Sequence, residues 1–319
     1  MILNVFFVIL GFLMLYLGAE LLVRGSTRIA ISYSIRPIII GLTVVAFGTS
    51  SPEFIVSFIS AIKKIDDIAI GNIIGSNIAN IGLILGVSSL IYPIKIKKAS
   101  FKIEIPVMIA SVVILFLLSI DGKISVSDGL ILMSCIIIFI FTLVFISIKR
   151  HREEMNGITQ RIRVESNTRK EKGRVLNVIF VLLGISGLVL GSNITINSSV
   201  KIAEALGIKN LIIGISLVAV GTSLPELATS VVSSLKKKSD ICFGNAIGSN
   251  IFNIFFVLGA VSIIKPLDMD LSVLKFEFPV MFLFSIILIP MMISGMIIKR
   301  LEGFILLAGY AVFIALLFR

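Results

Sequence analysis

Apolar runs long enough to cross a lipid bilayer dominate this chain, and short polar stretches separate them. Nearly uncharged segments of about 20 residues, the length that crosses roughly 30 Å of hydrocarbon, predict membrane-spanning helices. The pattern therefore predicts an all-α membrane protein with ten transmembrane helices. The expected spans are 2–22, 37–62, 68–92, 105–120, 126–148, 175–198, 210–235, 241–264, 278–298 and 301–318.

A polar signature occurs twice inside these apolar segments. Residues 48–53 read GTSSPE and residues 71–80 read GNIIGSNIAN, and the same signature returns 173 residues later as GTSLPE and GNAIGSNIFN. The chain is therefore an internal duplication with five spans in each copy. An odd number of spans turns the second copy upside down in the bilayer, as in many secondary transporters. We expect two inverted five-helix repeats at 1–148 and 175–319, joined by a basic loop at 149–174.

The composition and charge exclude a soluble globular domain. Hydrophobic residues make up 57% of the chain and charged residues only 15%, where a soluble domain has about a quarter charged. The net charge of +11 does not indicate a nucleic-acid partner, because 21 of the 29 Lys and Arg residues fall in one set of alternate loops. This is the positive-inside pattern of a membrane protein. We expect a multi-pass cell-membrane protein in contact with the lipid bilayer, with 149–174 in the cytoplasm, both termini outside, and no obligatory protein partner.

Two glutamates lie in the middle of apolar spans. A charged side chain there costs on the order of 3 kcal/mol, so Glu53 and Glu226 need a cation or a proton. Pro52 and Pro225 precede them, and a proline leaves backbone carbonyls of its helix without a donor. Free backbone at membrane depth is tolerated where it lines a polar cavity. We therefore expect breaks at these prolines in spans two and seven, although a proline kink whose hydroxyls bond back to the helix is the alternative. The expected fold has broken helices 2, 3, 7 and 8 at its core.

Hydroxyl and amide side chains lie at helical spacing around the glutamates. Thr49 and Ser50 stand four and three residues before Glu53, so the three side chains can converge. Asn72, Ser76 and Asn80 recur at four-residue intervals, and their counterparts are Asn245, Ser249 and Asn253. Asn77 and Asn250 point away from this stripe and are expected to be structural. The set offers only oxygen ligands, which suit hard cations such as Ca²⁺, whereas transition metals favour His or Cys.

At these residues the chain resembles the cation/calcium exchanger superfamily, and within it the prokaryotic Na⁺/Ca²⁺ exchangers. The resemblance rests on both copies of GTSxPE and GSNIxN. It implies that Glu53 and Glu226 are the central Ca²⁺ ligands, with the carbonyls of Thr49 and Thr222, and that Asn80 and Asn253 complete the middle of the site. It also implies flanking Na⁺ sites formed by Ser50, Ser223, Ser76, Ser249, the hydroxyls of Thr49 and Thr222, and the carbonyls of Ala46 and Ala219.

One departure from that superfamily affects the expected coupling. Some relatives place an aspartate at the position of Asn253, so this site carries two carboxylates rather than three. The number of Na⁺ ions, a role for K⁺ and proton coupling are therefore left open by the sequence.

The leading hypothesis is a secondary active antiporter that exchanges Na⁺ for Ca²⁺ by alternating access, with Na⁺ entry driving Ca²⁺ extrusion. The transported ions are its bound partners, and no cofactor or enzymatic activity is expected. An H⁺/Ca²⁺ exchanger that uses the same two glutamates is the alternative. A cation channel is a third possibility, which two opposed broken-helix repeats fit less well.

Overall fold

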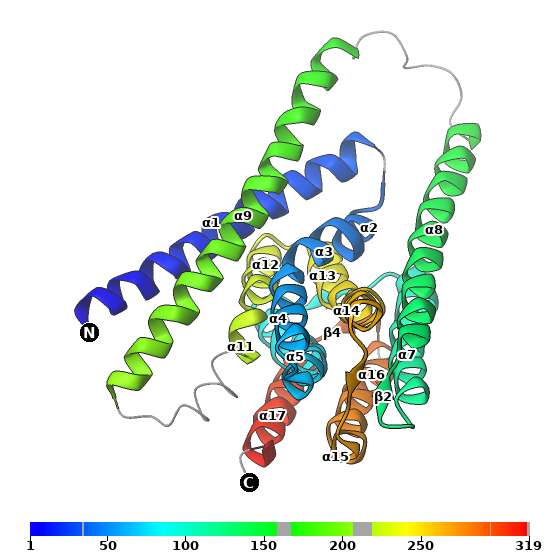
Figure 1. Cartoon of the computed structure of the whole chain (residues 1–319). Helices are drawn as coiled ribbons and strands as arrows, with labels where there is room; N and C mark the ends of the chain where they lie inside the picture. The colour runs from blue at the N-terminus through cyan, green and yellow to red at the C-terminus, as the bar shows by residue number, and fades with distance from the viewer. Residues whose placement is uncertain (34, 158–166, 207–218, 294, 318–319) are drawn as a thin grey trace.

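The computed structural model describes residues 1–33, 35–157, 167–206, 219–293 and 295–317, and this part of the chain is helical apart from short two-residue strands (Figure 1). Wide π-helical turns are labelled η. The first half contains α1 (Ile2–Ser32), α2 (Pro37–Ile40), η1 (Gly41–Val45), α3 (Ala46–Thr49), α4 (Ser51–Ile62), α5 (Asp66–Ala79), η2 (Asn80–Leu85), α6 (Gly86–Ile91), β1 (Ile94–Lys95), α7 (Lys98–Leu118), β2 (Lys123–Ile124) and α8 (Val126–Gly157). The second half contains α9 (Asn167–Ala205), α11 (Ala219–Thr222), α12 (Leu224–Leu235), α13 (Ser239–Phe252), η4 (Asn253–Leu258), α14 (Gly259–Ile264), β3 (Leu267–Asp268), α15 (Leu271–Lys275), α16 (Glu277–Ile293), β4 (Ile297–Ile298) and α17 (Arg300–Leu317).

The described residues include eight helices that are long and apolar enough to cross a membrane, or nine if one bent pair counts as a span. This confirms an all-helical protein with multiple membrane spans. The expected span at 210–235 overlaps residues 207–218, which lie outside the described part of the chain.

Only some of the expected helix breaks are present. The pair Pro37–Thr49 and Ser51–Ile62 bends by 43°, as expected for the second span. In contrast, Asp66–Ile91 and Ser239–Ile264 are each continuous, so the prediction of broken helices in the third and eighth spans was wrong. The physical reason is that no proline interrupts either segment. Each instead contains a π-helical turn, η2 or η4, which absorbs the distortion without ending the helix.

The two halves repeat the same elements at the sequence offset of the duplication. Helices α4, α5 and α6 correspond to α12, α13 and α14, and η2 corresponds to η4. The strands pair crosswise: β1 of the first half pairs with β4 of the second, and β2 pairs with β3, both antiparallel. The halves are therefore interlocked rather than side by side.

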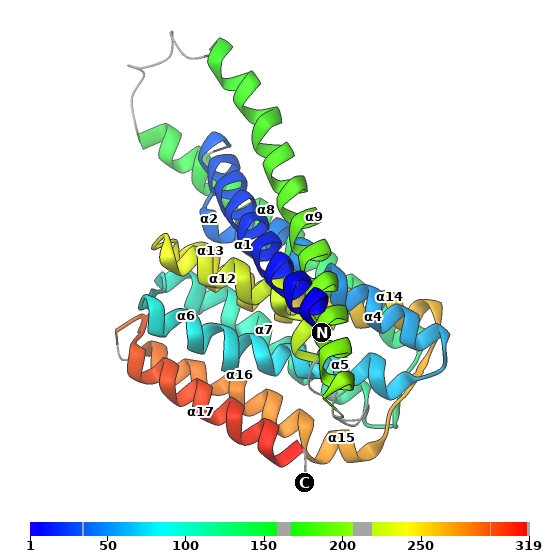
Figure 2. The same cartoon turned by 90° about the vertical axis from the view of Figure 1, so that its left-hand side faces the viewer.

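Helices α1 and α9 pack against each other and lie together across one face of the remaining bundle (Figures 1 and 2). Glycines allow this close approach, because a Cβ on Gly18 would lie 2.8 Å from the backbone nitrogen of Leu188, and one on Gly184 would lie 2.6 Å from that of Leu22. Small residues at helix contacts are the usual way for membrane helices to come close.

The polar segment between the halves is more helical than a loop at 149–174 implies. Helix α8 continues to Gly157 and α9 begins at Asn167, while residues 158–166 lie outside the described part. Glu, Lys and Arg have good helix propensity, and extending an existing helix avoids the cost of nucleation.

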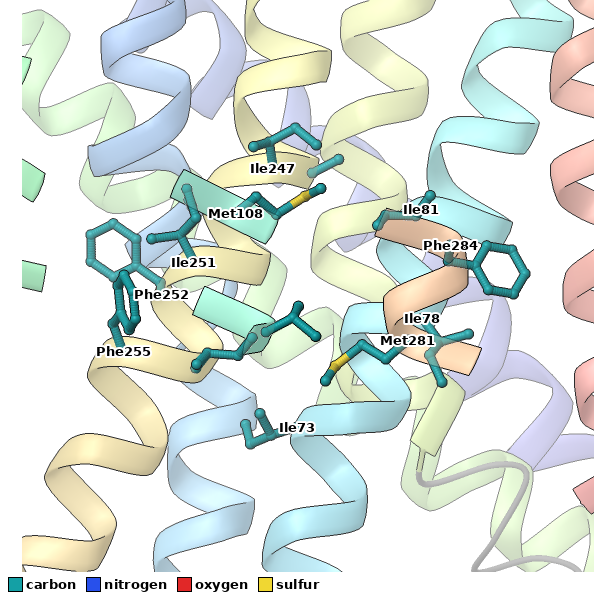
Figure 3. Close-up of a cluster of buried hydrophobic side chains, with 14 of the residues drawn as sticks. Ile73, Ile78, Ile81, Met108, Ile247, Ile251, Phe252, Phe255, Met281 and Phe284 are labelled. Atoms are coloured by element: carbon teal, nitrogen blue, oxygen red, sulfur yellow. The ribbon is translucent and has the colours of Figure 1, made fainter. Parts of the chain in front are cut away.

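The hydrophobic core surrounds the middle of the bundle, where α5, α13, α7 and α16 meet. Figure 3 shows part of it: Ile73, Ile78, Ile81, Met108, Ile247, Ile251, Phe252, Phe255, Met281 and Phe284. Most of these side chains are fully buried. They enclose the polar residues described next.

Candidate cation-binding site

Both glutamates lie in the first turn of a helix that follows a helix break. Ser50 and Ser223 have similar non-helical backbone angles, φ −79° and ψ 7° against φ −85° and ψ 6°. Each is followed by a helix with its proline at the start, where a missing N–H costs nothing. The two carboxylate side chains are fully buried. The GTSxPE motif therefore forms a break that places a carboxylate inside the bundle.

Serine hydroxyls connect each glutamate to the opposite half of the chain. Ser50 Oγ donates to Glu226 Oε1 at 3.1 Å, and Ser223 Oγ donates to Glu53 Oε1 at 3.3 Å. Within each half, Ser76 donates to Glu53 Oε1 at 3.3 Å and Ser249 donates to Glu226 Oε1 at 3.5 Å. The four serines and two glutamates thus form one cluster built by both halves.

Asn72 and Asn245 fix the backbone that carries the glutamates. Asn72 Nδ2 donates to the Glu53 carbonyl at 3.2 Å, and Asn245 Nδ2 donates to the Glu226 carbonyl at 3.2 Å. Their side-chain oxygens accept bonds from the other half, from Thr222 Oγ1 at 3.1 Å and from Thr49 Oγ1 at 3.0 Å. These amides therefore link the two halves and hold the backbone that carries each glutamate.

A second amide network orients Asn80 and Asn253. Asn80 Nδ2 donates to Asn250 Oδ1 at 2.9 Å, and Asn253 Nδ2 donates to Asn77 Oδ1 at 3.1 Å. Asn77 and Asn250 in turn donate to each other's backbone carbonyls at 3.4 and 3.2 Å. Their amide nitrogens also approach the sulfurs of Met281 and Met108, which Figure 3 shows on either side of the centre. Asn77 and Asn250 therefore position the two other asparagines, which agrees with the structural role expected from the sequence.

Four buried oxygens of this cluster accept no hydrogen bond from the described protein groups: Glu53 Oε2, Glu226 Oε2, Asn80 Oδ1 and Asn253 Oδ1. None of the ion pairs in the described residues involves either glutamate. A buried acceptor without a donor costs about 1–3 kcal/mol and more when it is charged. Two such carboxylates and two such amides from equivalent positions indicate a place prepared for a cation.

The donor set fits a hard cation. Among the described residues there is no group of three or more His, Cys, Asp or Glu side chains that could hold a metal. The cluster instead combines two carboxylates with neutral hydroxyl, amide and carbonyl oxygens. Such mixed oxygen ligands suit Ca²⁺ and other hard cations.

A small cavity borders the cluster at Ser50. It has a volume of about 200 Å³ and is lined by Phe47, Ser50, Ser51, Phe54, Ile55, Phe252 and Phe256. Ser50 faces this cavity and also donates to Glu226. Two of the lining rings, Phe47 and Phe256, make an edge-to-face contact with 5.4 Å between their centroids.

Comparison with known proteins assigns the chain to a family. The family model described as sodium/calcium exchanger protein matches residues 3–145 and 176–319. The chain belongs to this family. The sodium/calcium exchanger MaX1 of Methanosarcina acetivorans is 33% identical over 99% of this chain and 98% of its own length. The solved structure of the sodium-calcium exchanger NCX_Mj, soaked with Na⁺ and Ca²⁺, matches 99% of this chain and 98% of its own with 33% identity and a TM-score of 0.84.

A relative named Ca(2+)/H(+) antiporter, from Aphanothece halophytica, is 28% identical over 90% of this chain and 84% of its own length. The names of these relatives therefore give different counter-ions, sodium in one and a proton in the other.

Most residues expected at the site of this exchanger-family member lie together. The glutamates, Thr49, Thr222, Asn80, Asn253 and the four serines are all buried in the cluster, and Thr49 Oγ1 lies 3.3 Å from the Ala46 carbonyl. Ala219 begins α11, and its side chain lies outside the described part, as do residues 207–218 before it. The role of all these residues as ion ligands remains a prediction.

Two supporting residues were not expected from the sequence. Ser57 and Ser230 accept bonds from the amides of Asn72 and Asn245 at 3.0 Å. Each stands four residues after its glutamate, so helical periodicity places it on the glutamate's face. This four-residue spacing was the signal in the sequence that could have identified Ser57 and Ser230.

Proposed function

We propose that this protein is a secondary active antiporter that exchanges Na⁺ for Ca²⁺ across the cell membrane, most simply by extruding Ca²⁺ as Na⁺ enters. The observation that carries this proposal is the set of four buried oxygens without donors on Glu53, Glu226, Asn80 and Asn253. Membership in the sodium/calcium exchanger family and the similarity to NCX_Mj support the choice of ions.

The assigned roles follow the chemistry of each oxygen. The carboxylates of Glu53 and Glu226 and the carbonyls of Thr49 and Thr222 hold Ca²⁺, and the side-chain oxygens of Asn80 and Asn253 complete the middle of the site. Na⁺, with one charge, takes the flanking positions, where neutral oxygens outnumber carboxylates. Those positions use Ser50, Ser223, Ser76, Ser249, the hydroxyls of Thr49 and Thr222, and the carbonyls of Ala46 and Ala219.

Charge explains why exchange is obligatory. An empty site with two ionised glutamates carries about −2 inside a low-dielectric bundle, and that state is costly to occlude. One Ca²⁺ or two Na⁺ neutralise it. The protein therefore changes its accessible side only with cargo bound, which couples the two fluxes.

The architecture proposed for this mechanism is ten spans in two inverted five-helix repeats, 1–148 and 175–319, joined by the cytoplasmic segment 149–174, with both termini outside. The matched hydrogen bonds of the two halves and the crosswise strand pairs support it. The protein works as an ion carrier in the bilayer rather than as an enzyme, with ions as its bound partners.

An H⁺/Ca²⁺ exchanger is the alternative function. It is favoured by the similarity to a Ca(2+)/H(+) antiporter and by the presence of only two carboxylates, which can carry protons in place of Na⁺. A channel fits less well because both glutamates are fully buried.

Radiolabelled Ca²⁺ uptake into proteoliposomes loaded with Na⁺ and diluted into Na⁺-free buffer at matched pH tests the proposal. We expect uptake that depends on internal Na⁺ and is lost in Glu53→Gln and Glu226→Gln. Uptake that ignores Na⁺ and follows a pH step would move the assignment to H⁺/Ca²⁺ exchange, and no gradient-coupled uptake would refute both.

A further inference from the structure

A face of hydroxyl side chains continues from Glu226 along α12. Thr229, Ser230, Ser233 and Ser234 follow the glutamate at spacings of three, four, seven and eight residues, which places them on its side of the helix. All four are at most 2% exposed. The face ends at the C-terminus of α12, immediately before Lys236–Lys238.

This hydroxyl face is connected to the ion site at one end. Ser230 Oγ accepts from Asn245 Nδ2 at 3.0 Å, and the same amide holds the Glu226 carbonyl. Further along, Ser234 Oγ contacts Cys242 Sγ at 3.5 Å, and Ser88 of α6 lies beside that thiol. The polar groups therefore run from the site to the start of α13 without an apolar layer on α12 between them.

Two of these hydroxyls have no partner. Thr229 Oγ1 and Ser233 Oγ are buried and make no hydrogen bond with a described group. A serine in a helix interior usually donates to the carbonyl four residues earlier, as Ser285 does to Met281 at 2.9 Å. Buried polar groups without protein partners are typically satisfied by ordered water.

The first half shares only part of this feature, because Ser57 and Ser60 of α4 correspond to Ser230 and Ser233 while two hydroxyls have no counterpart. The positions on α4 that correspond to Thr229 and Ser234 are Val56 and Ala61, and Ala69 corresponds to Cys242. Ser57, the counterpart of Ser230, is bonded to the Ala69 carbonyl at 3.1 Å. Helix packing common to both repeats does not require a hydroxyl at the positions of Thr229 and Ser234, so these two residues on α12 point to a task on one side of the site.

The far end of the face is closed by α1. Helix α1 packs along α12, and Glu20 Oε1 lies 2.5 Å from Lys236 Nζ at the end of α12. The counterparts of these two residues, Asn193 and Lys63, carry no opposite charges. The closure by an ion pair is therefore specific to the same side as the hydroxyls.

We propose that Thr229, Ser230, Ser233 and Ser234 line a file of water molecules that carries cations between Glu226 and the Lys236 end of α12, and that α1 closes this path in the present structure. The inference rests on the proposed transport function and specifies where ions leave the site. The chemistry it needs is that of hydroxyl oxygens replacing part of a hydration shell as a cation passes.

Cys242 reports whether water enters this path. In a Cys135→Ala protein it is the single thiol, and a charged methanethiosulfonate reacts with it only where water carries the reagent. We expect Glu20→Gln, which releases the closing ion pair, to raise the modification rate, read by intact mass in nanodiscs, by about tenfold or more. A rate near zero in both proteins, with normal modification by membrane-soluble N-ethylmaleimide, would show that the thiol lies in a dry core and would overturn the proposal.

Transport provides a second readout. We expect Thr229→Val with Ser233→Ala to slow exchange at saturating ion concentrations about tenfold while Ca²⁺ binding, measured by calorimetry, stays unchanged. The matched controls are Thr142→Val and Ser285→Ala, whose hydroxyls bond back to their own helices, and these should keep the parent rate.

An unchanged rate in the double variant would contradict the water path. The failure of the transport function itself is recognised separately, because the parent protein would then show no gradient-coupled Ca²⁺ uptake, while the thiol experiment needs no transport.

Discussion

The Ser50 hydroxyl of the first half donates a 3.1 Å hydrogen bond to the Glu226 carboxylate of the second, and Ser223 makes the reciprocal bond to Glu53 at 3.3 Å. Each carboxylate therefore has one oxygen held by the opposite half and one left without a donor. The free oxygens are positioned by both halves at once, so a movement of either half changes the shape of the whole site.

Replacing either glutamate by glutamine should remove Ca²⁺ binding. Gln keeps the size and the acceptor for the serine hydroxyls but removes one of two charges facing a divalent ion. We expect Ca²⁺ affinity, measured by calorimetry, to fall by about 100-fold or more, which corresponds to roughly 2.7 kcal/mol. Glu204→Gln is the matched control, since it changes the same kind of side chain at an exposed position on α9, and an equal loss there would contradict the assignment.

Changing Asn253 to aspartate should alter the coupling ion. The Oδ1 of Asn253 is buried without a donor, and a third carboxylate there gives the empty site a charge of about −3. We expect stronger Ca²⁺ binding and a steeper dependence of uptake on Na⁺, because one more monovalent cation is needed for neutrality. The measurement is the Hill coefficient for Na⁺ in proteoliposomes, and an unchanged coefficient would show that this position does not set the stoichiometry.

Asn77→Ala should act through positioning. Asn77 accepts from Asn253 and donates to the Asn250 carbonyl, so its loss leaves buried groups unpaired, at a cost of about 1–3 kcal/mol. We expect a lower melting temperature and weaker Ca²⁺ binding together. Asn80→Ala is the contrast, because it removes a free oxygen directly and should lower affinity more than stability. Normal Ca²⁺ binding by Asn77→Ala would refute the idea that the Asn77 amide positions Asn253 for the ion.

The glycines of the GTSxPE motifs should be needed for contact with α9. A Cβ on Gly48 would lie 2.7 Å from Ile185 Cγ1, and one on Gly221 would lie 2.7 Å from Ile196 Cδ1. Both distances are too short for carbon atoms, so in Gly48→Ala either the Ile185 side chain or α9 itself has to shift, and the tight contact should hinder the movement of α9. We expect exchange to fall about tenfold, a barrier increase near 1.4 kcal/mol.

Ile185→Ala should restore much of the rate in the Gly48→Ala background, since it removes the colliding atoms. Ile185→Ala paired with Gly221→Ala is the control and should give no rescue. If Gly48→Ala alone exchanges at the parent rate, then ion exchange does not depend on the close contact between Gly48 and α9.

Much of the cluster followed from the sequence because it is built from local spacing and repetition. The motif positions 173 residues apart identified the glutamates, serines and asparagines, and helical periodicity placed Asn77 and Asn250 off the stripe. The pairing across halves did not follow, because nothing local shows that Ser50 reaches Glu226 rather than Glu53. The continuity of Asp66–Ile91 was also missed. The four-residue spacing of its polar side chains does not show whether the helix breaks, and a π-helical turn at Asn80–Leu85 lets it continue.

The crosswise strands β1–β4 and β2–β3 bear on how such a molecule could have arisen. Residues 1–148 alone would have two unpaired strand edges, one carboxylate at the site, and a Ser50 hydroxyl with no glutamate to meet. Two identical copies of such a chain could satisfy each other in the same crossed way, as an antiparallel homodimer in which each subunit donates to the other's carboxylate. Fusion into one polypeptide would then have freed the two copies to diverge, and the hydroxyls of Thr229 and Ser234, which are Val56 and Ala61 on α4, are a difference that an identical pair could not have carried.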